Sequence, residues 1–403
     1  MLNVEEIRRD FPILKTGVIY LDNAATSLTP EPVLQKTIEY YHEYRANVER
    51  GIHRLSQKAS EEYGKARSKI ARLINAKRED EVVFTKNTTE SINLVANGIG
   101  WRKGDKIVTT LIEHHSNLVP WQRLNQQTGI DLAVVKPDRE GTLNLSDFES
   151  VIDDRTRLVA LTHVSNVIGT IAPIEEVAEV AHNHGSLLLV DGAQSVPHMA
   201  IDVKRIGCDF LAFSGHKMLG PTGIGVLYMR EELVGEIQPQ SIGGGGTKEV
   251  TQEQYKLADS PSRFESGTPP IAEAISLGEA AEYLHRKGLE NVAAHERELA
   301  NRIHGELQAI DRVEVYGPIN PDHRTGIVSF NIAQVNPHDV ALALDISGKI
   351  MVRSGYHCCM PLVKDVLRLR EGTVRASVYI YNTVQEVDKL IELIGEIAPT
   401  GLL

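Results

Sequence analysis

Short apolar runs alternate with helix-like segments through the middle of the chain, and this alternation limits the possible folds more than any other feature. Six runs have the length of strands: DKIVTT, DLAVVKP, TRLVALTHVSN, SLLLVDGAQ, DFLAFSGHK and GIGVLYM. Several are nearly all apolar, as expected of parallel strands that are covered on both faces. Between two of them lies a segment with one apolar helical face and a glycine at the C-cap position: Ile174, Val177, Ala178, Ala181 and Gly185. The pattern predicts an α/β fold with a large, doubly wound, mostly parallel sheet.

The pattern changes after about Gly267, where two long helical stretches, short apolar runs and a helical tail follow one another. This is an α+β arrangement, and 403 residues exceed what one hydrophobic core usually supports. We therefore predict a large domain over residues 21–288 and a smaller C-terminal domain over residues 289–403, with residues 1–20 packing against the small domain. The glycine-rich stretch Ser241–Pro270 shows no clear periodicity and is predicted to be a flexible connecting loop.

The composition argues against several classes of protein. A formal net charge of −11 argues against nucleic acid as the main partner. No apolar run approaches the ~20 residues that span a bilayer, so no membrane partner is expected, and the N-terminal stretch MLNVEEIRRDFPIL does not resemble a signal peptide. Three cysteines in 403 residues do not make a disulfide framework, which predicts a cytoplasmic location.

Two predicted strands end in groups that suit pyridoxal phosphate (PLP) chemistry. Lys217 follows the apolar run in DFLAFSGHK, where burial would lower its pKa, as a Schiff-base lysine requires. Asp191 ends the strand in LLLVDGAQSV, where a carboxylate could pair with a protonated pyridine nitrogen. The alternatives are a surface lysine in a glycine-rich turn and an aspartate that caps a helix.

Two further places offer donors for a phosphate group. Thr88 and Thr89 open a predicted helix directly after the strand EVVFTKN, where free backbone N–H groups and the helix dipole favour an anion. Ser214 and His216, just before the lysine, add a hydroxyl and an imidazole. A simple N-cap is the alternative for Thr88, and it is compatible with the phosphate role.

Other strand ends supply a ring and an amide. His114 and His115 follow the run KIVTTLI, and a ring there could stack on a flat cofactor; a buried structural histidine or half of a zinc site is the alternative. Asn166 could reach the cofactor or the substrate. Because no H-x-x-x-H or C-x-x-C pattern is present, no metal is predicted. Together the strand ends predict one crevice at the carboxyl edge of the sheet.

The chain places two of its three cysteines side by side in RSGYHCCMPL, and this string completes a series of motifs. The others are LDNAATS, RGIHRLS, TTESINLVANGIG, EHHSNLVPWQ, THVSNVIGT, VDGAQSV, FSGHKMLGPTGIGVLY and FESGTP. In this order they resemble the motifs of SUF-type (group II) cysteine desulfurases and selenocysteine lyases, which are PLP-dependent class V aminotransferase relatives of fold type I. The resemblance runs from about Leu21 to Asn382 and therefore covers nearly the whole chain.

The resemblance implies a cofactor site for PLP. Lys217 would hold PLP as a Schiff base and move the α-proton of the substrate, and Asp191 would pair with the pyridine nitrogen. Gln194 would lie near the phenolic oxygen, while His114 would stack on the ring and take part in catalysis. The residues implied to bind the cofactor are Thr88, Thr89, His114, Asn166, Asp191, Gln194, Ser214, His216, Lys217 and Thr268.

The resemblance also implies a substrate site and a homodimer with shared active sites. Thr268 would reach the phosphate bound by the neighbouring subunit. Arg353 and Arg375 would hold the substrate carboxylate, because a guanidinium binds both carboxylate oxygens at once. His53 and Asn166 would lie nearby.

The implied reaction converts L-cysteine to L-alanine, with transfer of the sulfur to Cys358 as a persulfide. The thiolate is the nucleophilic form, and nearby Arg353 and His357 would favour ionisation. The sulfur would pass to an acceptor protein or an iron–sulfur scaffold, for iron–sulfur cluster or other sulfur-containing cofactor biosynthesis. The catalytic residues are thus predicted to be Lys217, Cys358 and His114.

Two positions depart from the family pattern, and several alternatives remain open. Tyr356 stands where the family usually has histidine, and Cys359 replaces a small residue. The second thiol could relay a persulfide, or it could be a tolerated substitution. A selenocysteine lyase, a class V aminotransferase or epimerase with incidental cysteines, and a catalytically silent scaffold in an iron–sulfur assembly complex are the alternative functions.

Overall fold

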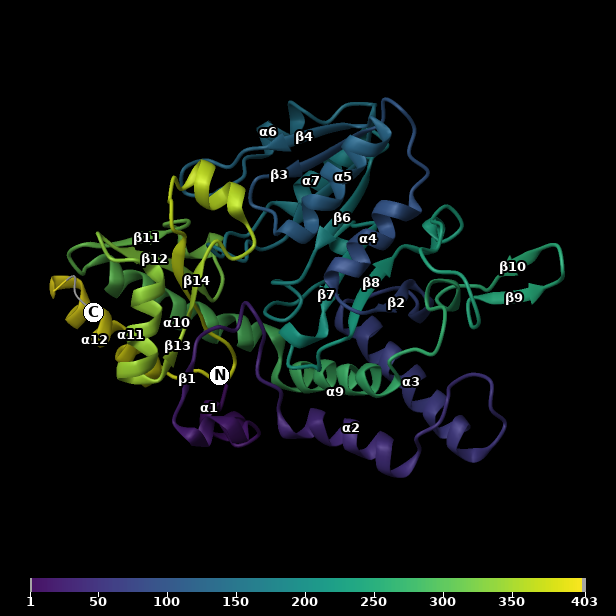
Figure 1. Cartoon of the computed structure of the whole chain (residues 1–403), viewed down its shortest axis with the longest axis horizontal. Coiled ribbons are helices and arrows are strands. Elements are labelled where there is room, and N and C mark those ends of the chain that lie inside the picture. The colour runs from purple at the N-terminus through teal and green to yellow at the C-terminus, as the bar shows by residue number, and fades with distance from the viewer. Residues whose placement is uncertain (1, 401–403) are drawn as a thin grey trace.

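The computed structural model describes residues 2–400, and its largest element is a seven-stranded sheet in the order β2-β8-β7-β6-β5-β3-β4 (Figure 1). Its strands are β2 (Val82–Thr85), β3 (Lys106–Thr110), β4 (Asp131–Val135), β5 (Thr156–Thr162), β6 (Leu187–Asp191), β7 (Phe210–Ser214) and β8 (Gly225–Met229). The strands from β4 to β7 pair in parallel, whereas β8 is antiparallel to both of its neighbours. The predicted doubly wound, mostly parallel α/β sheet is confirmed.

The strands are apolar on both sides because helices cover both faces of this sheet. In β6, Leu188 and Val190 belong to one core and Leu189 to the other, as the two-residue period of a strand requires. One face packs against α4 (Thr88–Gly98) and α5 (Val119–Thr128). The other face packs against α3 (Arg54–Leu73), α6 (Leu145–Glu149), α7 (Ile174–Asn183), α8 (Val203–Ile206) and α9 (Ile271–Lys287), with α2 (Glu31–Glu43) lying on α9. None of the helices in residues 2–400 is long and apolar enough to cross a membrane.

A second, antiparallel sheet forms near the C-terminus in the order β11-β12-β15-β14. Its strands are β11 (Val313–Tyr316), β12 (Ile327–Ile332), β14 (Arg353–Gly355) and β15 (Thr373–Ser377), and it packs with α10 (Leu289–Gln308), α11 (Pro337–Gly348) and α12 (Val384–Thr400) around a separate core. In its register, Arg353 lies directly opposite Arg375. This sheet therefore presents two guanidinium groups from neighbouring strands.

The N-terminal segment lies against the C-terminal part of the chain (Figure 1). Helix α1 (Val4–Arg8) is tied there by an ion pair between Arg8 Nη1 and Glu386 Oε1 at 2.8 Å. Strand β1 (Ile19–Tyr20) pairs in parallel with β13 (Ile350–Met351). The division of the chain at residue 289 stays a prediction, and helix α10 begins at that residue.

The prediction of an irregular connecting loop over Ser241–Pro270 was wrong in its central part. Strands β9 (Thr247–Val250) and β10 (Tyr255–Leu257) form an antiparallel hairpin that extends away from the body of the molecule (Figure 1). Neither strand contains a buried residue. Since a strand exposed on both faces needs no alternation of apolar and polar residues, the sequence carried no periodic signal for it.

A buried ion pair joins α3 to the segment that follows this hairpin. Glu265 accepts hydrogen bonds from Arg67 Nη1 and Nη2 at 2.8 and 2.9 Å, from the backbone N–H of Phe84 at 2.6 Å and from Tyr63 Oη at 3.0 Å. Both charged side chains are more than nine-tenths buried. A buried charge without its partner is costly, so Arg67 depends on Glu265.

We expect Glu265→Gln to lower the free energy of unfolding by about 3–5 kcal/mol, because it leaves the Arg67 charge uncompensated. Equilibrium urea denaturation measures the change. The matched control is Glu249→Gln in the exposed Lys256–Glu249 pair, which should cost less than about 1 kcal/mol. Equal effects in the two variants would contradict the structural role of the buried pair.

Candidate active site

The carboxyl ends of the parallel strands and the edge of the second sheet enclose a cavity of about 240 Å³. In the first sheet, its wall comes from residues at or shortly after the ends of strands β3, β5, β6 and β7, which is where ligands bind in open α/β sheets. The second sheet contributes Arg353, Arg375 and the loop that carries Cys358. The structure thus brings together residues that lie up to 351 positions apart in the chain, from Ala24 to Arg375.

The N-terminus of α4 forms one corner of the cavity, and several hydroxyl groups lie close together there. The backbone N–H of Thr88 donates to Ser214 Oγ at 2.8 Å, and Thr89 Oγ1 lies 2.7 Å from Ser116 Oγ. Gly225 allows this corner to form, since a Cβ atom there would stand 2.5 Å from Asn87 Cα. Hydroxyl groups beside a helix N-terminus suit an anion, and the predicted phosphate role of these residues stays a prediction.

Lys217 and Asp191 line the middle of the same cavity. Burial lowers the pKa of Lys217 to about 8, although the Asp191 carboxylate opposes this shift. Burial raises the pKa of Asp191, whose Oδ1 accepts a hydrogen bond from the N–H of Ala193 at 3.0 Å. Beside them, Gln194 donates from Nε2 to the carbonyl of Ala24 at 2.6 Å, and its buried Oε1 has no hydrogen-bond partner.

His114 follows the turn after β3, and its ring lines the cavity as a neutral imidazole. Burial, assisted by the charge of Lys217, lowers the pKa of His114 to about 3. Its Nδ1 accepts a hydrogen bond from the backbone N–H of Ser116 at 3.1 Å, so the ring proton resides on Nε2. The same causes lower the pKa of His216 to about 4. Both rings are therefore uncharged at neutral pH.

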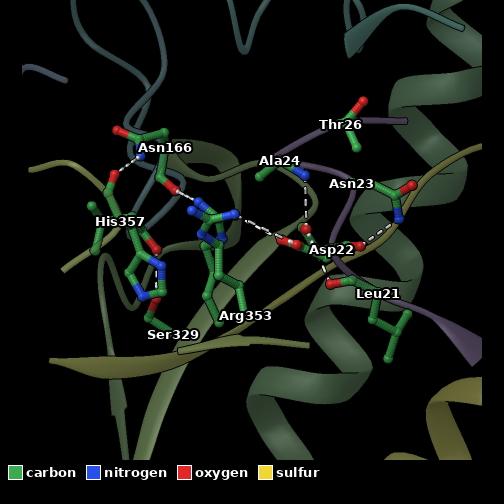
Figure 2. A network of polar contacts seen from close by, with 12 residues as sticks. Leu21, Asp22, Asn23, Ala24, Thr26, Asn166, Ser329, Arg353 and His357 are labelled. Atoms are coloured by element: carbon green, nitrogen blue, oxygen red, sulfur yellow. Dashed lines mark hydrogen bonds and ion pairs between the residues drawn. The ribbon is translucent and has the colours of Figure 1, made fainter. Parts of the chain in front are cut away.

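The two arginines both line the cavity and differ in exposure. The side chain of Arg375 is 2% exposed, whereas that of Arg353 is 46% exposed. Arg375 Nη1 donates to the carbonyl of Asn166 at 2.7 Å, and its Nη2 lies 3.0 Å from Asp22 Oδ1. The amide of Asn166 donates in turn to the carbonyl of His357 at 2.7 Å (Figure 2). Asn166 therefore connects the cysteine loop to the buried arginine.

The loop that carries Cys358 is held in a defined conformation. His357 and Cys358 have φ angles of 50° and 56°, a left-handed conformation that costs a non-glycine residue about 1–3 kcal/mol. The backbone N–H of His115 donates to the carbonyl of Cys358 at 2.7 Å, and His115 Nε2 accepts from the N–H of Met360 at 3.2 Å. On the other side, Tyr356 Oη donates to the carbonyl of Arg370. These contacts hold the exposed thiol of Cys358 at the cavity wall.

Comparison with known proteins identifies the family. The sequence matches the aminotransferase class-V family over residues 19–390. A probable cysteine desulfurase of Pyrococcus abyssi is 48% identical over 98% of this chain and 97% of its own length, and a cysteine desulfurase of Haloferax volcanii is 45% identical over 98% and 96%. The chain belongs to the class V aminotransferase family and, within it, to the cysteine desulfurases. The prediction of a class V cysteine desulfurase is confirmed.

Solved cysteine desulfurases have the same fold. The apo structure of the enzyme from Thermococcus onnurineus NA1 superposes with a TM-score of 0.95 at 48% identity, covering 100% of this chain and 99% of that one. The cysteine desulfurase CsdA from Escherichia coli, solved as an S-sulfonic acid, superposes with a TM-score of 0.92 at 34% identity, with full coverage of both chains.

One expectation for the cysteine loop of this desulfurase was wrong, and one open alternative is narrowed. Burial lowers the pKa of His357 to about 2, so the neutral ring brings no positive charge to the neighbouring thiol. The thiol of Cys359 is completely buried, and its Sγ lies 3.8 Å from the carbonyl oxygen of Leu111. Burial raises the pKa of Cys359 well above its ordinary range, so it stays protonated. The packed position of Cys359 therefore favours a tolerated substitution over a persulfide relay.

Two of the predicted site residues lie outside this cavity. His53 caps α3, where its Nδ1 accepts a hydrogen bond from the N–H of Ser56 at 3.3 Å. Thr268 lines a second cavity of about 220 Å³ together with Arg50 and Gly244. Their predicted roles at a cofactor or substrate stay predictions, and within one chain the two residues do not meet Lys217.

Two acidic residues that contact the cavity wall through hydrogen bonds, Glu113 and Asp22, were missed from the sequence. Glu113 is fully buried, and its carboxyl group accepts hydrogen bonds from Thr110 Oγ1, the N–H of Thr162 and Asn117 Nδ2, at 2.7, 3.0 and 2.6 Å. Burial raises the pKa of Glu113 to about 8. The sequence signal that could have identified Glu113 was an acidic residue directly after the apolar strand run KIVTTLI. Asp22 gave no signal beyond its place in the LDNAATS motif.

Brief treatment of the native protein with iodoacetamide should alkylate Cys358 and leave Cys208 and Cys359 unmodified. The reason is that Cys358 is exposed, whereas burial both shields the other two thiols and raises their pKa values. Fragmentation mass spectrometry distinguishes the two adjacent cysteines. Denatured protein, in which all three should react, is the control; equal modification of Cys359 and Cys358 in native protein would refute the assignment.

Proposed function

We propose that this cysteine desulfurase uses PLP to convert L-cysteine to L-alanine and takes the sulfur onto Cys358 as a persulfide. The observation that carries the proposal is the meeting of three groups at one cavity: the exposed thiol of Cys358, the amine of Lys217 and the arginine pair. The overall reaction balances without a further oxidant. The thiol of Cys358 gains the sulfur atom of the substrate, and the Cβ of the substrate gains a hydrogen in its place.

The residues present fit PLP as the cofactor. The buried Oε1 of Gln194 has no hydrogen-bond partner and is available to a polar ligand, and the buried Asp191 carboxylate suits a protonated ring nitrogen. Thr88, Thr89, Ser214 and His216 would hold the phosphate at the N-terminus of α4. When bound, PLP withdraws electrons from the substrate, which weakens the bond between Cβ and sulfur.

The other side chains around the cavity would transfer a proton, stack on the cofactor and bind the substrate. A lysine with a pKa of about 8 is partly unprotonated at neutral pH, so Lys217 can both anchor a carbonyl group and accept the α-proton of the substrate. The neutral ring of His114 can stack on a flat heterocycle without placing a second cation beside Lys217. Arg353 and Arg375 hold the substrate carboxylate, which orients its sulfur toward the thiolate of Cys358.

We also propose that the persulfide sulfur passes to a protein acceptor or an iron–sulfur scaffold, for cluster or other sulfur-cofactor biosynthesis in the cytoplasm. The exposed thiol of Cys358 supports delivery to a macromolecule rather than storage. All three cysteines are free, which fits a reducing compartment.

A homodimer with shared active sites is part of this proposal. Thr268 lies in a different cavity of its own chain, so a contact with bound phosphate requires a second copy. Exposed apolar side chains near this region, Ile52 at 93% and Ile242 at 53% exposure, support a covered surface.

Lys217→Ala should abolish the visible absorption band of bound PLP, because the variant cannot form the Schiff base. Cys358→Ala should keep the band but lose at least about 100-fold in sulfide released from L-cysteine with a reductant, since the acceptor of the sulfur is gone. Cys359→Ala is the matched control and should stay within about twofold of the native rate. Loss of activity in Cys359→Ala with full activity in Cys358→Ala would contradict the proposal.

Sedimentation equilibrium should find a dimer, and Thr268→Ala should weaken PLP binding by about tenfold, as expected for loss of one hydrogen bond to a charged group. Fluorescence titration of the apo-protein with PLP measures the affinity. Thr247→Ala on the hairpin serves as the control. A fully active monomer would remove Thr268 from the site.

A further inference from the structure

Two adjacent histidines follow strand β3, and their rings have different partners. The ring of His114 lines the cavity, and its Nδ1 accepts from the N–H of Ser116 at 3.1 Å. His115 is not among the described residues of the cavity wall, and its Nε2 accepts from the N–H of Met360 in the cysteine loop at 3.2 Å. Because a rigid peptide bond joins the two histidines, the cysteine loop is attached directly beside the ring that faces the cavity.

His115 binds the cysteine loop on both sides of the reactive thiol. Its backbone N–H donates to the carbonyl of Cys358 at 2.7 Å, while its ring accepts from the N–H two residues later, at Met360. At the start of the same turn, the carbonyl oxygen of Leu111 lies 3.8 Å from Cys359 Sγ. The turn of residues 111–115 therefore contacts three consecutive residues of the loop.

The conformation of the loop depends on such outside contacts. His357 and Cys358 have left-handed φ angles of 50° and 56°. This conformation is unfavourable for residues other than glycine and persists only where the surrounding structure imposes it. Within the loop, the N–H of Cys359 donates to the carbonyl of Tyr356 at 2.9 Å, which closes a tight turn around the thiol. The two hydrogen bonds of His115 hold that turn from the side of the large sheet.

The ring of His115 can accept a hydrogen bond only in its neutral form, with Nε2 unprotonated and the proton on Nδ1. Burial lowers the pKa of His115, which favours this form at neutral pH. In His114 the accepting nitrogen is Nδ1, so the two neighbouring rings carry their protons on opposite nitrogens.

We propose that His115 is a positioning residue for the nucleophile: its ring and backbone N–H hold the cysteine loop in register with His114, so that the Cys358 thiol meets a substrate bound beside the His114 ring. This inference rests on the proposed function, in which His114 stacks on PLP and Cys358 takes the sulfur. His115 acts on the reaction only through the loop residues that it binds.

His115→Phe keeps a flat ring and removes the accepting nitrogen. In the PLP-loaded enzyme, kcat for sulfide release from L-cysteine with a reductant should fall by about tenfold, since a lost hydrogen bond leaves the thiol poorly placed. The absorption band of bound PLP and the inhibition constant of the product L-alanine should stay within about twofold of native, because the groups that line the cavity are unchanged.

His115→Gln tests whether the hydrogen bond itself matters, because its amide oxygen offers an acceptor at a similar reach. This variant should keep kcat within about twofold of native. Hydrogen exchange at the Met360 amide, followed by fragmentation mass spectrometry, should quicken by about tenfold in His115→Phe and stay near native in His115→Gln. The control is His184→Phe, which removes a bond to Asp154 before the start of β6, at the edge of the sheet away from the cavity. It should change neither quantity.

Native kcat in His115→Phe, or an equal loss of kcat in the phenylalanine and glutamine variants, would overturn the inference. If His115→Phe does not fold, nitrogen-15 NMR of the histidine-labelled holoenzyme gives the test: Nε2 of His115 should be unprotonated at neutral pH, and a protonated Nε2 would overturn the inference. Absence of native turnover of L-cysteine would instead refute the proposed function, while exchange at the Met360 amide would still report on the contact with His115.

Discussion

A guanidinium group buried between two sheets must find hydrogen bonds and a counter-charge, and the arrangement of this site depends on how Arg375 finds them. The carbonyl of Asn166, after a strand of the large sheet, accepts from Nη1, and Asp22 pairs with Nη2. Both partners lie outside the sheet that carries Arg375. The contacts of this one side chain therefore join the small sheet to the carboxyl ends of the large one, and the cavity forms where they meet.

Burial also sets the protonation of the cavity. It lowers the pKa values of His114, His216 and His357 to about 3, 4 and 2, so three rings that could carry positive charge are neutral. The cationic groups that remain are the two arginines and a lysine with a pKa of about 8. Positive charge in the cavity is thus concentrated at the arginine pair, and Lys217 can exchange a proton near neutral pH.

The cysteine loop shows how contacts from both sheets maintain a conformation that is unfavourable locally. Two consecutive non-glycine residues, His357 and Cys358, have positive φ angles. His115 and Asn166 hold their carbonyl groups from the large-sheet side, while Tyr356 binds the carbonyl of Arg370. Tyr356 therefore has a place in the fold of the loop. The contacts hold the exposed thiol of Cys358 in a fixed position at the cavity wall.

The sequence alone determined the sheet and most of the cavity. Apolar strand runs fix where strands end, and parallel strands bring those ends to one edge of the sheet. For this reason the sequence could place four residues at the cavity: Lys217, Asp191, His114 and Asn166. The tertiary structure alone decided matters that depend on distance and burial. These include the neutral state of His357, the packing of Cys359 and the pairing of Asp22 with two arginines. Chain order gives residue types and periodicity, but the solvent exposure and charged neighbours of a side chain exist only after segments distant in sequence have packed together.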